Sequence, residues 1–329
     1  MRLLQSSFLL FSFTLVFTIS TLVMADHKHD HHHHHGDHGH HSHHDHHHDD
    51  SLQQNLPDDE FTEMNRKHWN DYAASYMKEQ WQKDMVKLMT EFMVANHDWI
   101  GVDFADISTS SEASALPKAV RVLDYACGPG TMTHALAGKA TEYVGVDISE
   151  NMVKAYNLRF NPEPVIDSTA TRSSEDIVDQ SLNAQAVVGN LLAESGTPES
   201  LDGAKFHDFD LVVIGGGYHH FSNLTLATAR LVERLKPGGV LLVLDFVSHG
   251  VSDSEKNHPA APTIAHHGFN EQQLQAYFEG AGLVEFKMKK SGQAMKMRGI
   301  EPREPLLARA RKPHLTGIEQ RPMKGEAAL

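Results

Sequence analysis

Cysteine and positive charge are both scarce in this chain of 329 residues. The single cysteine, Cys127, has no partner for an intrachain disulfide, and it rules out a metal cluster built on cysteines. Lysine and arginine number 29 against 43 acidic residues, so the formal net charge is −14. A broad basic face of the kind that grips nucleic acid is therefore not expected, and neither is a nucleic-acid partner.

Long apolar runs are also missing, except for one at the N-terminus. After Arg2 no charged residue occurs before Asp26, and the run ends in the small residues that typically precede a signal-peptidase cut. We therefore expect residues 1–25 to be a signal peptide and the chain to enter the secretory pathway. If left uncut, the same run is long enough to span a bilayer. The alternative is thus a membrane-anchored form facing the lumen, and contact with a membrane is expected only in that case.

A tract of histidine and aspartate follows the apolar run. Fifteen of the 26 histidines lie between His27 and His48, a composition that cannot build a packed core, so we expect residues 26–57 to be disordered. Because imidazole is a common ligand of Zn, Ni and Cu, the tract is a candidate for loose, non-catalytic metal binding. The other interpretation is a solvated low-complexity tail. The densest run consists of His31, His32, His33, His34 and His35.

The remaining sequence predicts one α/β domain over residues 58–313, followed by a disordered tail over 314–329. Residues 58–116 form a helical cap and linker, because apolar and aromatic residues recur there at a spacing of three and four. From 117 to 313 short apolar strands alternate with helices, which indicates a Rossmann-like, doubly wound, mostly parallel sheet of seven strands. The first set of residues at this spacing would form one face of a helix, which we assign to the core. It consists of Phe61, Met64, His68, Tyr72 and Tyr76.

The stretch "VLDYACGPG" at 122–130 ends the first predicted strand and opens the first helix of the sheet. In such sheets ligands bind beyond the carboxyl ends of the strands. Gly128 and Gly130 permit close approach of a ligand, and Asp124 can accept hydrogen bonds from a cationic amine. Asp147 ends the next strand, near the distance at which nucleotide-binding folds place an acid on ribose hydroxyls. The loop lacks both the full G-x-G-x-x-G pattern and the P-loop lysine, which weakens dinucleotide and nucleoside-triphosphate hypotheses.

Five segments in this order resemble the class I S-adenosylmethionine-dependent methyltransferases. The resemblance is greatest to the small-molecule branch around the ubiquinone and menaquinone C-methyltransferases, and it covers about Phe61 to Pro313. It implies S-adenosylmethionine as cofactor and a small-molecule methyl acceptor, and it leaves the acceptor atom open. The segments are VLDYACGPG, VGVDIS, GNLLAE, FDLVVIGGGYHHF and LVERLKPGGVLLVLDF.

The resemblance also implies a role for each matching residue around the methionine and ribose parts of the cofactor. Asp124 and the backbone from Ala126 through Gly128 to Gly130 would hold the methionine end. Asp147 would hold the ribose hydroxyls.

Further matches concern the adenine. Ile148 and Met152 would pack near it, and Asn190 would meet its amino group at a position where the family more often has aspartate. Leu191 would offer its backbone amide to the ring. Tyr76 loosely matches an aromatic residue placed over the cofactor, the alternative being a helical core residue.

His219 and His220 follow the fourth predicted strand and are the candidate catalytic residues, since a histidine is a plausible general base near neutral pH. The alternative is that they cap or pack the strand end. Asn223-Leu-Thr is an N-glycosylation sequon, usable only if the chain enters the secretory pathway.

Two functions compete at this stage. The first is an active methyltransferase, which the intact cofactor residues favour. The second is a secreted metal-binding protein that uses the histidine tract and keeps the methyltransferase fold as a non-catalytic scaffold.

Overall fold

The computed structural model describes residues 58–105, 118–162, 178–193, 195–297 and 300–314. The predicted signal peptide, the histidine tract with His31–His35 and the tail from residue 315 lie outside the described residues. No helix within the described ranges is long and apolar enough to cross a membrane.

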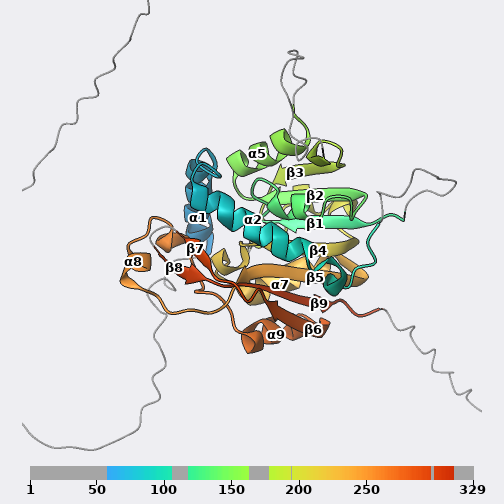
Figure 1. Ribbon diagram of the computed structural model, residues 1–329. Coiled ribbons are helices and arrows are strands. Elements are labelled where there is room, and N and C mark those ends of the chain that lie inside the picture. The colour runs from blue at the N-terminus through green and yellow to red at the C-terminus, as the bar shows by residue number, and fades with distance from the viewer. Residues whose placement is uncertain (1–57, 106–117, 163–177, 194, 298–299, 315–329) are drawn as a thin grey trace, which may run out of the picture. The chain divides into compact units, whose positions relative to one another are not determined.

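Seven strands form the central sheet, in the order β3-β2-β1-β4-β5-β9-β6 (Figure 1). Strand β1 pairs in parallel with both β2 and β4, whereas β9 runs antiparallel to its neighbours β5 and β6. The chain therefore reverses its direction of winding beside β1, which creates a switch point at the carboxyl ends of β1 and β4. The predicted doubly wound, mostly parallel sheet is confirmed. The strands are β1 Arg121–Tyr125, β2 Glu142–Asp147, β3 Ala184–Val188, β4 Phe209–Gly215, β5 Leu235–Phe246, β6 Val284–Lys290 and β9 Pro305–Arg311.

Helices cover both faces of the sheet, and each face has its own apolar core. Successive strand residues point to opposite faces, so Val122 joins the core shared with Met132 and Tyr156, while Leu123 joins the core shared with Leu231. This two-sided burial explains why the strands read as continuous apolar runs. The connecting helices are α4 Thr131–Ala135, α5 Glu150–Phe160, α7 Leu224–Glu233 and α9 Glu271–Gly280.

The helical cap consists of α1 Asp58–Ala73, α2 Gln80–Val94 and the short α3 His97–Ile100. The sequence predicted a continuous helical pattern over this region, but the chain turns between α1 and α2, where Met77 adopts a positive φ of 66°. Within α1 only Phe61 and Asn65 are buried, so most of the predicted core stripe is half-exposed. Helix α2 packs on α4 and carries the cap onto the sheet.

A small hairpin near the cap was not predicted. Strands β7 Met295–Met297 and β8 Ile300–Arg303 pair with each other, and β7 packs against α2. The short helix α8 Asp253–Lys256 contacts β8 through a buried ion pair between Glu255 and Arg303. The sequence offers little signal here, because strands of three and four residues are too short to show a clear alternation of apolar and polar side chains.

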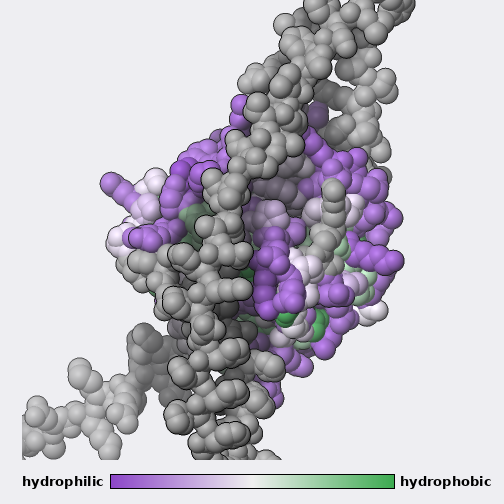
Figure 2. Space-filling model, turned by 90° about the vertical axis from the view of Figure 1, so that its left-hand side faces the viewer, coloured by the Kyte–Doolittle hydropathy of each residue, from purple (hydrophilic) through white to green (hydrophobic). Residues whose placement is uncertain are grey.

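Strand β5 also begins earlier than expected. The Pro-Gly-Gly segment at 237–239 is typical of the end of a helix, but Leu235 already pairs with Phe209, and a register shift follows. On the face shown in Figure 2 the described residues are mainly hydrophilic, with only small hydrophobic areas.

Candidate active site

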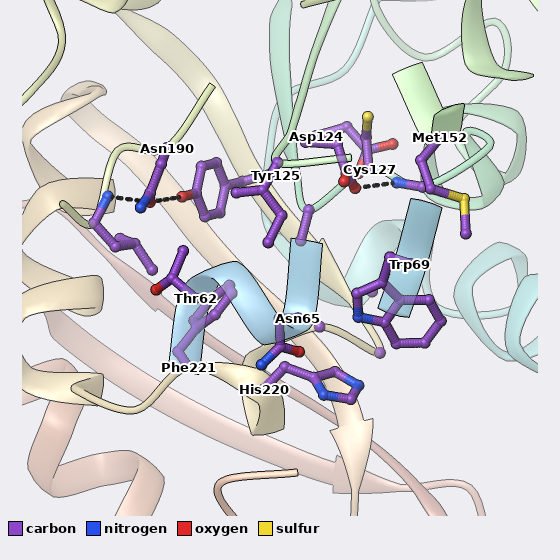
Figure 3. Close-up of a pocket in the computed structure, with 18 of the residues that line it drawn as sticks. Thr62, Asn65, Trp69, Asp124, Tyr125, Cys127, Met152, Asn190, His220 and Phe221 are labelled. Carbon is purple, nitrogen blue, oxygen red and sulfur yellow. Dashed lines mark hydrogen bonds between the residues drawn. The ribbon is translucent and has the colours of Figure 1, made fainter. Parts of the chain in front are cut away.

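A single cavity brings together nine of the twelve residues predicted to bind cofactor or to act in catalysis. It lies where β1, β2 and β4 end, between the loop after β1 and the helices α1 and α2 (Figure 3). Gly130, Leu191 and His219 do not line it. The nine that do are Tyr76, Asp124, Ala126, Gly128, Asp147, Ile148, Met152, Asn190 and His220.

Asp124, at the end of β1, has one carboxylate oxygen without a partner. Its Oδ2 accepts hydrogen bonds from the backbone N of Thr133 at 3.1 Å and from its hydroxyl at 2.8 Å. Its Oδ1 is buried and has no hydrogen-bond partner. Burial raises the pKa of Asp124 to about 7, an effect that the bonds from Thr133 partly oppose. An unpaired carboxylate oxygen at a cavity wall suits a cationic donor that replaces the lost hydration.

The glycines of the loop after β1 have different tasks. Gly130 begins α4 with φ 86°, and a Cβ on it would lie 2.3 Å from the ring of Phe160, so this glycine is required for packing. Gly128 has φ 50°, and a Cβ there would meet no protein atom within 4 Å. Because Gly128 lines the cavity, its missing side chain leaves room for a ligand.

Asp147 is held in a fixed orientation at the end of β2. The backbone N of Gly128 donates to its Oδ2 at 2.8 Å, and the backbone N of Ser149 donates to its Oδ1 at 2.8 Å. Burial raises the pKa of this carboxyl, and the backbone hydrogen bonds act in the opposite direction. Each oxygen keeps a further lone pair, so the group can still accept bonds from a ligand in the cavity.

The end of β3 contributes a hydrogen-bonded turn. Asn190 Oδ1 accepts the backbone N of Leu192 at 2.8 Å and the hydroxyl of Tyr125 at 3.3 Å. Leu191 is buried, and its backbone N donates to the Tyr125 hydroxyl at 3.1 Å. The amide assigned to the adenine ring is therefore already engaged, and the cavity wall at this point is made by Leu192 and Ala193.

The two candidate catalytic histidines have different surroundings. His220 lines the cavity, and its Nδ1 lies 2.6 Å from the backbone oxygen of Thr263. A carbonyl oxygen only accepts hydrogen bonds, so Nδ1 carries the hydrogen and Nε2 keeps a lone pair. Burial lowers the pKa of His220 well below 6.5, which keeps the ring neutral.

His219 does not line the cavity. Its Nδ1 lies 2.9 Å from Oδ1 of Asp245, which is fully buried, and its ring centroid lies 4.1 Å from that of His220. The backbone oxygen of His219 accepts the amides of Ala265 and His266. His219 thus ties the turn after β4 to the segment that supplies the Thr263 carbonyl, and it supports His220.

One wall of the cavity comes from α1 and was not identified from the sequence. Thr62, Asn65 and Trp69 line it, and the Trp69 ring lies 5.2 Å from the ring of His220 (Figure 3). These positions recur at three and four residues, which is the spacing of one helix face. Two of them carry polar side chains, so a search for apolar residues at helical spacing does not find this face. Tyr76 lines the cavity and is half-buried, which raises its pKa.

Helix α1 is fastened to the residues that follow Asp147. Arg66 pairs with Glu150 at 2.7 Å, and Asn70 Oδ1 accepts the Ser149 hydroxyl at 2.7 Å. The acid at the end of β2 and the wall formed by α1 are therefore linked through one short segment.

The described residues contain no group of three or more His, Cys, Asp or Glu side chains that could hold a metal ion. The predicted metal ligands His31–His35 fall outside the ranges that the structure covers.

Comparison with known proteins gives a consistent family. A family model described as a methyltransferase domain matches residues 100–285. An uncharacterized methyltransferase of Schizosaccharomyces pombe is 29% identical over 166 residues, which make up 49% of this chain and 52% of that protein. A ubiquinone/menaquinone biosynthesis C-methyltransferase of Hydrogenovibrio crunogenus is 33% identical over 129 residues, covering 38% of this chain and 41% of that protein. The chain thus spans about half the length of the curated relatives it matches.

The chain also aligns in part with solved structures of low sequence identity. Phosphoethanolamine N-methyltransferase 2 of Haemonchus contortus, in complex with phosphomonomethylethanolamine and S-adenosylhomocysteine, aligns with 67% of this chain and 57% of that chain. The identity is 15% and the TM-score is 0.42.

Proposed function

We propose that this chain, which belongs to the methyltransferase-domain family, transfers a methyl group from S-adenosylmethionine to a small molecule. The observation that carries the proposal is the unpaired Oδ1 of Asp124 at the cavity wall. The methionine part of the cofactor bears a cationic amine, which is the donor that this oxygen lacks.

The other cavity residues fit the rest of the cofactor. Gly128 leaves space where a side chain would project into the cavity, and Asp147 presents acceptors for ribose hydroxyls. Ile148 and Met152 supply apolar surface for the adenine. Asn190 would meet the ring with Nδ2, because its Oδ1 already accepts two hydrogen bonds. That donor suits a ring nitrogen better than the amino group that the sequence suggested.

When bound, the cofactor supplies an electrophilic methyl group on a sulfonium. The chain's own work is to align the acceptor, exclude water and receive a proton. His220 suits the last task because its Nε2 has a free lone pair and its ring is neutral. His219 acts through His220 by holding the turn that carries both residues.

Calorimetric titration of the full chain with S-adenosylhomocysteine tests the proposal. Asp147→Ala should weaken binding by about 1–3 kcal/mol, because it removes charge-assisted hydrogen bonds to the ribose. Absence of binding by the intact protein at millimolar ligand would contradict the proposed function.

We also propose that the chain enters the secretory pathway. The apolar run before Asp26 supports this location, because its length and its small-residue ending are typical of a signal peptide. The enzyme would then use cofactor supplied outside the cytosol.

A further inference from the structure

Asn70 joins α1 to the first turn of α5. Its Oδ1 accepts two hydrogen bonds, from the hydroxyl of Ser149 at 2.7 Å and from the backbone N of Asn151 at 3.0 Å. Its Nδ2 donates to the carboxylate of Glu150 at 2.5 Å. The backbone oxygen of Asn70 also accepts Asn151 Nδ2 at 3.0 Å. One residue of α1 therefore bonds to three consecutive residues at the start of α5, beside which α1 lies (Figure 1).

The bonds of Asn70 complete the N-terminus of α5. Amides in the first turn of a helix have no acceptor within the helix, so other groups must satisfy them. Ser149 is the N-cap, and its hydroxyl oxygen accepts the backbone N of Met152 at 3.1 Å. The amide of Asn151 is satisfied by Asn70, which lies on a different helix. Helix α5 thus has one cap from its own sequence and a second cap from α1.

The turn that these caps hold carries residues of the cavity. Ser149 is fully buried, and its backbone N donates to Oδ1 of Asp147 at 2.8 Å. Asp147, Ile148 and Met152 line the cavity. Asn70 does not line it, so it fixes residues that we assign to the cofactor without itself reaching the ligand.

Apolar burial holds α1 in place only in part. Of its 16 residues only Phe61 and Asn65 are buried. Oδ1 of Asn65 has no hydrogen-bond partner among the described residues, so docking of α1 leaves one buried acceptor unsatisfied. The ion pair of Arg66 with Glu150 is partly exposed on both sides, and such pairs contribute little. The bonds of Asn70 to the buried cap of α5 are therefore expected to supply an appreciable part of the docking energy.

We propose that Asn70 is a positioning residue that couples the docking of α1 to the binding of the cofactor. This inference rests on the proposed function. With α1 docked, Asn70 holds the turn at 147–149 in the position that binds the cofactor, so the affinity for the cofactor is higher. Coupling between two equilibria is reciprocal, so bound cofactor favours docked α1 by the same factor. Cofactor binding thereby helps to complete the cavity wall that α1 supplies, where Thr62, Asn65 and Trp69 lie (Figure 3).

Calorimetric titration of the full chain with S-adenosylhomocysteine measures the contribution of Asn70. Asn70→Ala removes the second cap of α5 and should weaken binding about 5- to 50-fold, which is within the usual range for coupled sites. Arg66→Gln is the matched control, because Arg66 lies one turn earlier on α1 and bonds to Glu150 but not to the caps of α5. It should change the affinity less than about twofold. Equal affinities of Asn70→Ala and wild type would overturn the proposal.

An exchange of donor and acceptor separates this role from a general loss of folding. Asn70→Asp keeps an acceptor for the first turn of α5 but places a carboxylate oxygen against Glu150. Adding Glu150→Gln supplies a donor to that oxygen from the other side, so the double variant should bind S-adenosylhomocysteine within about threefold of wild type. A double variant that binds as weakly as Asn70→Ala would contradict the proposal.

Hydrogen exchange measures the reciprocal effect and does not depend on activity. At saturating S-adenosylhomocysteine, exchange of the α1 amides should slow about 5- to 50-fold in wild type and much less in Asn70→Ala. A residue with a structural role alone would change exchange equally with and without the ligand, so equal slowing in the two proteins would exclude coupling through Asn70. If wild type does not bind S-adenosylhomocysteine, the proposed function fails together with this inference. If wild type and Asn70→Ala bind it equally, only this inference fails.

Discussion

Asp124→Asn should stabilise the protein without ligand and at the same time weaken cofactor binding. The carboxyl has a pKa raised by burial from 3.8 to about 7. The difference is about 3 units, and each unit is worth about 1.4 kcal/mol, so keeping Asp124 ionised in the free protein costs about 4 kcal/mol at most. Asparagine has the same shape, stays neutral and can still accept a bond from Thr133.

The sign of the pH dependence follows from the raised pKa. Between about pH 4 and 7 the folded protein holds a proton on Asp124 that the unfolded chain has lost, so this group makes unliganded wild type less stable as pH rises. At pH 8 the asparagine variant should therefore melt about 4 °C higher than wild type, which corresponds to about 1–2 kcal/mol. The advantage should shrink towards pH 4.

Ligand binding should show the opposite preference. The carboxylate form holds the amine, so the affinity of wild type for S-adenosylhomocysteine should rise roughly tenfold from pH 6 to pH 8. The variant should bind roughly 10- to 100-fold more weakly at pH 8. The affinity of the variant should also depend less on pH. Any pH dependence that remains in the variant reports the titration of the ligand itself and can be subtracted from that of wild type. Scanning fluorimetry and calorimetry measure both effects. A variant that melts no higher than wild type and binds equally well would refute the role assigned to Asp124.

Further predictions concern the glycine loop, the histidine tract and the location. Gly130→Ala should lower the free energy of unfolding by about 1–3 kcal/mol, because the added Cβ would overlap the buried Phe160 ring at a residue with positive φ. Gly128→Ala should fold, but calorimetry should show weaker binding of S-adenosylhomocysteine, because the added Cβ would occupy the cavity. Deleting residues 26–50 should leave cofactor affinity unchanged and abolish most retention on immobilised nickel; a large loss of affinity would place the tract in the site. N-terminal sequencing of protein from the native host should find a start at Asp26, and an intact Met1 in the soluble cytosol would contradict secretion. If the host's secretory pathway attaches N-glycans, Asn223, exposed at the start of α7 and lining the cavity, should carry one that a glycosidase removes.

Local sequence was sufficient to predict most of the residues that line one end of the cavity, where we propose that the cofactor binds. Asp124 and Asp147 lie at the ends of β1 and β2, and Gly128 lies in the loop after β1. Parallel strands bring their carboxyl ends to one edge of the sheet, so these residues meet there. The glycine loop and the alternation of apolar strands with helices are short-range patterns, so they identify the fold without knowledge of distant contacts. The same patterns could not separate the packing glycine, Gly130, from the cavity glycine, Gly128.

The rest of the site depended on tertiary structure. His219 and His220 are adjacent in sequence, and only the partners Asp245 and Thr263, 26 and 43 residues away, decide which of them faces the cavity. Asn70 is a polar residue inside a helical pattern, with nothing in its neighbourhood to mark it. It becomes a candidate positioning residue because folding places α1 against the start of α5, where its Oδ1 accepts two hydrogen bonds. Side-chain periodicity is local, whereas the hydrogen-bond partners of a side chain are defined only by the complete set of its neighbours.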